Sequence, residues 1–263
     1  MSGISLDGKS FFYENPLEID PEFNNVNRST AQKERFPITQ RVEVFNCSCC
    51  PPNLVRFLSS VGDYLYTEDE DTVYVHQYMA SETNGQGLHI TQQTRYPADG
   101  KIQIFGTADQ KCLALRIPGW CRNFRLNVPY TLKNGYAYIA VSGQFQVELE
   151  LDMPVTVMAA NRRVHENAGR VAVMRGPVVY CVEGVDNGED LKTVAIDPKG
   201  DFRVGENRFL LPNLYTTGFR PAESVALYAL AEDSFEEIPL TLIPYYAFAN
   251  RGTTAMQVWL LRK

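Results

Sequence analysis

The sequence predicts a mainly β protein in which one helix precedes two groups of strands. From residue 72 onward, apolar and polar residues alternate in short runs, which is the period of a half-buried strand. Pairs such as Asp99-Gly100 and Asn134-Gly135 separate these runs and are typical of β-hairpin turns. Apolar residues at helical spacing occur at 51–65. Many short strands at this spacing indicate β-sandwiches or a barrel.

The composition is that of a globular chain able to bury a core, with 44% hydrophobic residues among 263. The chain has 25 Lys and Arg against 31 Asp and Glu, a net charge of −6. This acidic balance argues against a nucleic-acid or anionic-membrane partner. No apolar run approaches the ~18 residues that span a membrane. We favour a cytoplasmic location. A periplasmic or secreted location stays open, because we expect the chain to be a fragment of a longer protein.

Residues 1–65 are expected to form an irregular segment that ends in the helix. Prolines and asparagines punctuate residues 1–46, which indicates a long loop. Pro51 and Pro52 suit the first turn of a helix, where a missing N–H costs little. The apolar residues that then recur at helical spacing are Leu54, Val55, Leu58, Val61 and Leu65.

The strands fall into two groups. A polar stretch at 161–169 interrupts the alternating pattern, and we place a domain boundary there. The sequence therefore predicts one β-sandwich at 66–168 and a second, smaller one at 169–263. The expected strands of the first lie at 72–78, 88–96, 101–106, 112–117, 124–128, 136–142 and 144–152. Those of the second lie at 171–174, 178–183, 191–196, 225–230, 238–243 and 256–261.

Three of the six cysteines, Cys47, Cys49 and Cys50, lie within four positions just before the helix. A helix N-terminus carries partial positive charge and favours thiolate over thiol, so a cysteine there is a better metal ligand and nucleophile. Three thiols form a soft ligand set suited to zinc. The spacing differs from a zinc knuckle, which needs two separated Cys pairs. The residues alone leave three alternatives open, namely a metal site, a reactive thiol or redox centre, and a buried set of reduced thiols.

Residues 47–53 read Cys-Ser-Cys-Cys-Pro-Pro-Asn. With Leu54, Leu58 and the Tyr-Leu-Tyr sequence at 64–66, this stretch resembles glycoside hydrolase family 127, the β-L-arabinofuranosidase-like enzymes. Further stretches that agree with the family pattern, in the right order, lie at 2–8, 15–18, 116–120, 175–180 and 243–252. The resemblance covers nearly the whole chain, and the Cys-Cys-Pro-Pro-Asn element is its most specific part.

The resemblance implies a fold and a site. Family members have a helical (α/α)6 barrel followed by two β-sandwich domains, so residues 1–65 would be a short helical remnant of that barrel carrying the Cys cluster. The family's zinc is held by an upstream Glu-x-Cys element and by two adjacent cysteines, which match Cys49 and Cys50. Cys49 also matches the family's proposed nucleophile. Glu43, the nearest upstream carboxylate, does not match Glu-x-Cys.

The resemblance thus implies the C-terminal fragment of a zinc-dependent retaining glycosidase that acts on β-L-arabinofuranosides or related sugars. Two zinc ligands and the acid/base Glu have no match, so we expect an incomplete zinc site and no activity of the chain alone. The rival function is a non-catalytic β-sandwich module for carbohydrate binding or assembly. The expected partners are a carbohydrate substrate in the parent protein and either a second copy of the chain or a helical barrel portion.

Other candidate residues carry weaker signals. His76 and His89 lie in strand patterns and are expected to be strand residues rather than metal ligands. Trp120 follows Pro118-Gly119 and either packs at a sandwich corner or stacks on a sugar. The cysteines expected to behave as buried small apolar residues are Cys112, Cys121 and Cys181.

Overall fold

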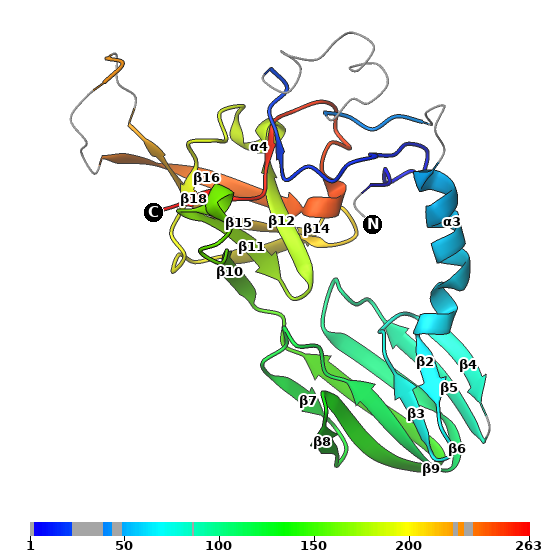
Figure 1. Ribbon diagram of the computed structural model, residues 1–263. Coiled ribbons are helices and arrows are strands. Elements are labelled where there is room, and N and C mark those ends of the chain that lie inside the picture. The colour runs from blue at the N-terminus through cyan, green and yellow to red at the C-terminus, as the bar shows by residue number, and fades with distance from the viewer. Residues whose placement is uncertain (1–2, 23–38, 44–48, 86, 223–225, 229–233) are drawn as a thin grey trace. The chain divides into compact units, whose positions relative to one another are not determined.

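The computed structural model describes residues 3–22, 39–43, 49–85, 87–222, 226–228 and 234–263 (Figure 1). The chain divides into two compact units. The middle unit is Cys49–Pro154, and the second unit combines Met1–Ser48 with Val155–Lys263. Strands make up 48% and helices 11%, so the prediction of a mainly β chain is confirmed. In the part of the chain that is described, no helix is long and apolar enough to cross a membrane.

The predicted helix is present as α3 (Cys50–Ser60), continued by the 3-10 turn η1 (Val61–Tyr64). Its two prolines stand in the first turn, as expected. None of its residues is buried, and the exposed apolar side chains include Val55 (65%), Phe57 (48%) and Leu58 (44%). Of the apolar residues expected at helical spacing, Val55 and Leu58 are exposed, Leu54 and Val61 are half-buried, and Leu65, beyond the helix, is buried.

The middle unit is built on an eight-stranded sheet. Its path runs β2–β3–β6–β5–β4, with β9 paired to β6, and β7 and β8 paired to β9. The strands are β2 (Tyr66–Glu68), β3 (Thr72–Val75), β4 (Ser81–Gly85), β5 (Leu88–Thr94), β6 (Lys101–Arg116), β7 (Phe124–Leu126), β8 (Thr131–Lys133) and β9 (Tyr136–Leu151).

Strands β6 and β9 are 16 residues each, where the sequence predicted two shorter strands in each place. Ser142-Gly143, at the break between the strands expected at 136–142 and 144–152, lies inside β9, so the expected break is wrong. The reason is a bulge, because the register of the β6–β9 pair shifts between Ala108 and Lys111. Gln110 and Gly143 there have φ of 50° and 63°. The chain thus bends at the polar interruption without leaving the sheet.

The bulge divides β6 into two halves with different neighbours. Its first half pairs antiparallel with β5, and its second half pairs parallel with β3, while β9 follows both. One face of these strands forms the core of the middle unit. Buried side chains at alternate positions that contribute to it include Val73, Val75, Ile102, Ile104, Leu113, Leu115, Ile139, Val147 and Leu149.

The second unit is built on a ten-stranded sheet in the order β1–β17–β12–β16–β15–β13–β18–β11–β10, with β14 paired to β15. The strands are β1 (Glu18–Ile19), β10 (Val155–Ala159), β11 (Arg170–Arg175), β12 (Val178–Glu183), β13 (Ala195–Ile196), β14 (Arg203–Asn207), β15 (Pro212–Pro221), β16 (Phe235–Pro244), β17 (Met256–Gln257) and β18 (Leu260–Arg262). The short helical elements are α4 (Gly184–Asn187), η2 (His165–Asn167) and η3 (Tyr245–Ala247).

Two features of this unit differ from the expected strands. The strand expected at 225–230 is wrong where it can be checked, because Ala226–Tyr228 form an exposed bend, and the other residues of that run lie outside the described part. Strand β10 pairs with β11 along its whole length, so the chain enters the second sheet at Val155, ahead of the polar stretch at 161–169.

Candidate functional site

The adjacent cysteines Cys49 and Cys50 stand at the start of α3. Cys49 is the N-cap residue and is exposed, and Cys50 is the first helical residue and is half-buried. Their Sγ atoms lie 3.5 Å apart, and neither residue forms a disulfide. The third member of the sequence cluster, Cys47, lies outside the described residues.

The two prolines reduce the number of N–H donors at the start of this helix. An α-helix leaves its first four N–H groups without an intrahelical partner. Pro51 and Pro52 occupy two of those positions and have no N–H, and the N-cap side chain makes no capping hydrogen bond. A ligand at this helix start would therefore interact mainly with the helix dipole and not with N–H donors of these two residues.

The spacing of the two sulfurs fits one metal ion. Zn–S bonds of about 2.3 Å at tetrahedral angles separate two sulfurs by about 3.8 Å. The observed Sγ–Sγ separation of 3.5 Å is close to that value. No group of three or more His, Cys, Asp or Glu residues that could hold a metal occurs among the described residues. The Sγ–Sγ separation would allow both sulfurs to bind one tetrahedral metal ion.

The histidines have local partners in the strands. His76 Nδ1 lies 2.8 Å from the Tyr136 hydroxyl, and its Nε2 lies 2.7 Å from Thr67 Oγ1. Burial lowers the pKa of His76, and the charge of Arg116 acts in the same direction. His89 Nδ1 lies 2.8 Å from Asn84 Oδ1. Both imidazole rings therefore have hydrogen-bond partners within the middle unit.

Trp120 packs half-buried against the core of the middle unit, with its ring stacked on Tyr96 at a centroid distance of 6.4 Å. This is the packing alternative of the two expected for it. Among the remaining cysteines, Cys181 is buried, and burial raises the pKa of its thiol well above the ordinary value. Cys112 and Cys121 are half-buried, and partial burial raises the pKa of both.

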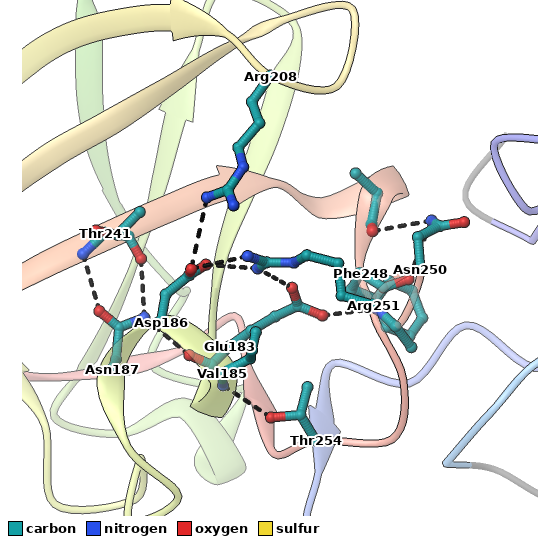
Figure 2. Close-up of polar contacts among 12 residues, drawn as sticks. Glu183, Val185, Asp186, Asn187, Arg208, Thr241, Phe248, Asn250, Arg251 and Thr254 are labelled. Carbon is teal, nitrogen blue, oxygen red and sulfur yellow. Dashed lines mark hydrogen bonds and ion pairs between the residues drawn. The ribbon is translucent and has the colours of Figure 1, made fainter.

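A buried ion cluster in the second unit was not expected from the sequence (Figure 2). Arg251 Nη2 contacts Glu183 Oε2 at 2.5 Å, and its Nη1 donates to Asp186 Oδ1 at 2.8 Å. Glu183 is fully buried, and its Oε1 accepts the Ala249 N–H at 2.6 Å. Hydrogen bonding to Asp186 is the main reason that the pKa of Arg251 is raised. The cluster joins α4 to residues 245–254, which carry one of the family-like stretches.

The N-terminal segment contacts the same residues, 245–254. The guanidinium of Arg41 lies 4.8 Å from the Phe12 ring centroid and 5.1 Å from that of Phe248. It donates to the carbonyl oxygens of Phe248 and Tyr246. Burial lowers its pKa to about 10, so it remains a cation at neutral pH. Asn250 Oδ1 accepts the Leu6 N–H at 3.0 Å. Residues on both sides of 23–38 are thus held by residues 245–254.

Comparisons with known proteins agree with the family-like stretches. Three family profiles match consecutive parts of the chain. They are the β-L-arabinofuranosidase GH127 catalytic domain at 1–63, the GH127 middle domain at 72–155 and the glycoside hydrolase family 127 C-terminal domain at 155–261. The two cysteines and β1 fall within the first match, β3 to β9 within the second, and β10 to β17 within the third.

Individual relatives agree. A non-reducing end β-L-arabinofuranosidase of Bifidobacterium longum subsp. longum is 35% identical over all of this chain and 43% of its own length. The crystal structure of a GH127 β-L-arabinofuranosidase from Geobacillus stearothermophilus T6 has a TM-score of 0.87 at 37% identity, covering all of this chain and 44% of that one. The solved structure of another GH127 β-arabinofuranosidase has a TM-score of 0.82 at 31% identity, and the match covers all of this chain and 43% of that one. The chain thus spans less than half the length of these relatives. It belongs to glycoside hydrolase family 127 and spans part of the catalytic, the middle and the C-terminal domains of that family.

Proposed function

We propose that this chain is the C-terminal portion of a zinc-dependent retaining glycosidase that acts on β-L-arabinofuranosides or related sugars. The observation that carries the proposal is the Cys49–Cys50 pair, whose sulfurs lie 3.5 Å apart in the segment that matches the family's catalytic domain. The names of the relatives support the substrate class. They describe β-L-arabinofuranosidases, one of them acting at the non-reducing end.

The proposal includes the finer architecture. Residues 1–65 would be the last part of an (α/α)6 barrel, and the two β units would be sandwich domains. The exposed apolar side chains of α3, including Phe57 (48%) and Leu58 (44%), support the first statement, because such a helix needs a large apolar surface to cover it. We expect the covering surface to be a helical barrel portion, or a second copy of the chain when that portion is absent.

Cys49 and Cys50 would hold the zinc, with the other two ligands outside this chain. Zinc, when bound, would keep both thiols deprotonated at neutral pH. Cys49 is the more exposed of the two, so we assign it as the nucleophile and Cys50 as a ligand only.

The chemistry assigned to Cys49 has two steps. Its sulfur forms a bond to the anomeric carbon as the bond from that carbon to the leaving oxygen breaks, and an acid residue gives the leaving oxygen a proton. Water then forms a bond to the anomeric carbon as the carbon–sulfur bond breaks, and the same residue takes a proton from the water. We assign that residue to the part of the family's catalytic domain that this chain does not span.

The test compares the chain alone with the chain supplied with the rest of the family's catalytic domain, on an aryl β-L-arabinofuranoside. The chain alone should show no turnover, because general-acid catalysis worth ~10²–10⁴ in rate and most substrate positioning are missing. It should also retain little zinc on dialysis against a mild chelator. Turnover by the chain alone, or stoichiometric zinc in it, would show that the site is complete within these residues.

Three cysteine variants of the completed enzyme test the assigned roles. Cys49→Ser should lower kcat by at least about 10³-fold, because an alcohol is a poorer nucleophile and leaving group than a thiolate. Cys50→Ser should act mainly by weakening zinc retention, so added zinc should restore part of the rate. Cys112→Ser, a half-buried control on β6, should keep normal turnover. Full activity of Cys49→Ser would remove the nucleophile assignment.

The rival function, a non-catalytic module for carbohydrate binding or assembly, makes a different prediction. A module of that kind would bind carbohydrate through one of its β units and would gain no turnover when the rest of the catalytic domain is supplied. Persistent inactivity of the completed protein, with zinc bound, would favour the module over the glycosidase.

A further inference from the structure

A hollow of about 660 Å³ lies over one face of four neighbouring strands of the middle unit, β5, β6, β9 and β7. Its volume falls within the ~300–1,000 Å³ typical of small-molecule sites. The residues that line it are polar or charged, apart from three apolar residues that belong to the strands beneath it. The hollow lies wholly within one unit and includes neither Cys49 nor Cys50.

The register of the sheet explains why polar side chains gather here. Gln93 pairs with Gln103, and Gln103 pairs with Glu148 on the next strand. The Glu148 N–H donates to Asn127 Oδ1 at 2.8 Å, which continues the row to the residue that follows β7. Directly paired residues share one face of a sheet. Their neighbours along the strands, such as Ile102, are buried in the core, so this row lies on the outward face.

A second row runs beside the first. Lys101 pairs with Glu150, and Glu150 pairs with Arg125. The Arg125 guanidinium contacts Glu150 at 2.8 Å, and that of Arg95 contacts Asp99 at 2.7 Å. Neighbouring strands are ~4.8 Å apart, so the two rows form a grid of amides, guanidinium groups and carboxylates with close, regular spacing.

The charges of the hollow balance. Three cations line it, Arg95, Lys101 and Arg125, and so do three carboxylates, Asp99, Glu148 and Glu150. An anionic ligand requires a surplus of cations, and a hard metal ion requires carboxylates without competing cations. None of the described residues that line the hollow is aromatic, which disfavours a large apolar ligand. The remaining class is a neutral ligand with many hydrogen-bonding groups.

We propose that this hollow is a binding site for a neutral oligosaccharide, with Gln103 and Glu148 at its centre. Each sugar hydroxyl both donates and accepts, and the grid offers both kinds of partner, since carboxylates accept, guanidinium groups donate and amides do both. A guanidinium or a carboxylate can also bond to two neighbouring hydroxyls at once. The site is distinct from the Cys49–Cys50 pair and would hold a glycan without cleaving it.

The test is binding of soluble arabinan, a neutral polysaccharide, to the 263-residue chain, measured by retardation in affinity gels and by calorimetry with arabino-oligosaccharides. We expect binding that does not change between low and high salt, because no net charge is neutralised. Gln103→Ala should weaken it at least tenfold. Gln144→Ala is the matched control, because it changes a glutamine of β9 that does not line the hollow and should bind normally. Equal thermal unfolding midpoints would show that both variants are folded.

Two further measurements test the inference that the ligand is neutral. Glu148→Gln keeps the size of the side chain, replaces one acceptor oxygen by a donor and removes the charge, so binding of arabinan should weaken at least about threefold. Polygalacturonate, an anionic polysaccharide, should bind more weakly than arabinan. Absence of arabinan binding, normal binding by Gln103→Ala, or tighter and salt-sensitive binding of polygalacturonate would each overturn the proposal. Binding is read without turnover, so failure of the proposed glycosidase activity leaves the result unchanged.

Discussion

Single residues of this chain differ in chemistry because their surroundings differ, and the cysteines show it most clearly. Cys49 is exposed at a helix start, whereas Cys181 is buried in β12 beside the ion cluster. Sequence patterns placed Cys49 and Cys50 at the start of a helix to within one residue, since the helix begins at Cys50 and was expected from 51. They gave no signal for the partnership of Arg251 with Glu183, because these residues lie 68 positions apart and neither stands in a local motif that requires an ion pair.

The first residue-scale prediction concerns thiol reactivity. With iodoacetamide at pH 8, Cys49 should be alkylated within minutes and Cys181 should stay unmodified for as long as the protein is folded. The reason is that Cys181 is inaccessible and burial raises its pKa, so its thiolate fraction is small. Mass spectrometry of the labelled peptides measures both rates. Unfolding the chain in guanidinium should make the two rates similar, and fast labelling of Cys181 in the native chain would contradict the prediction.

The second prediction concerns the ion cluster. Arg251→Ala should lower the free energy of unfolding of the second unit by about 3–5 kcal/mol, because it leaves the buried carboxylate of Glu183 without its cation. Arg251→Lys should recover only part of this, since a single ammonium cannot reproduce the fork that contacts Glu183 and Asp186. The exposed pair of Lys192 and Glu18, in the same unit, provides the control, and Lys192→Ala should cost less than about 1 kcal/mol.

The two tryptophans make this measurement specific. Trp259 lies in the second unit and Trp120 in the middle unit. In a Trp120→Phe background, fluorescence during urea unfolding reports the second unit alone. A loss below 1 kcal/mol for Arg251→Ala would show that Glu183 is not held as a buried anion by this contact.

The third prediction concerns pH. Burial lowers the pKa of His76 in the folded chain below its ordinary value of 6.5. The unfolded chain therefore binds the proton more readily, and stability that is fully present above pH 6.5 is lost as the pH falls below it. The urea midpoint of the middle unit, followed by Trp120 in a Trp259→Phe background, should fall between pH 7.5 and pH 5. His76→Gln should reduce that fall, and an equal fall in both proteins would contradict the assignment.

At the scale of elements, local sequence and the pairing of strands make different contributions to where a turn forms. Asn134-Gly135 forms the predicted hairpin turn between β8 and β9, with φ of 51° and 79°, as a type I′ turn requires. Ser142-Gly143 carries a similar signal and yet lies within β9, because β6 supplies a bulge opposite it. Turn chemistry permits a turn, and the partner strand decides whether one forms.

The element-scale prediction concerns the closest approach between two strands. A Cβ added at Gly106 would lie 1.8 Å from the carbonyl oxygen of His89, a backbone atom of β5 that cannot move without breaking the ladder. Gly106→Ala should therefore destabilise the middle unit by about 2–4 kcal/mol. Gly119→Ala meets nothing within 4 Å and should cost less than about 1 kcal/mol. Comparable urea midpoints for the two variants would contradict this reading of the β5–β6 contact.

At the scale of the whole molecule, the mainly β class could be predicted from periodicity, whereas the assembly of the second sheet could not. That sheet takes β1 from the start of the chain and pairs it with β17, and no local pattern encodes a pairing of such separation. The extent of the candidate site was likewise readable only in part. The adjacent cysteines indicate a metal ligand pair or a nucleophile. The described residues contain no group of three or more His, Cys, Asp or Glu that could complete a metal site.

The prediction at this scale concerns amide exchange. In a monomeric sample, amides of α3 should exchange with deuterium within minutes, because none of its residues is buried, while those at the centre of β6 and β9 should be protected for hours. Peptide-resolved mass spectrometry measures both. Supplying the rest of the family's catalytic domain should slow exchange in α3 selectively. Strong protection of α3 in a strictly monomeric sample would show that its apolar side chains are covered within the chain.

The pairing of Glu18–Ile19 with Met256–Gln257 has a consequence for the order of events at the ribosome. Translation proceeds from the N-terminus, and domains generally fold as they emerge. Residues 49–154 can complete their sheet while the ribosome is still making the rest of the chain. The segment ahead of Cys49 must wait for residues 245–257, which supply its partners for Arg41 and β1. Cys49 and Cys50 therefore lie, in sequence, where a segment whose partners are made last meets a unit that can fold early.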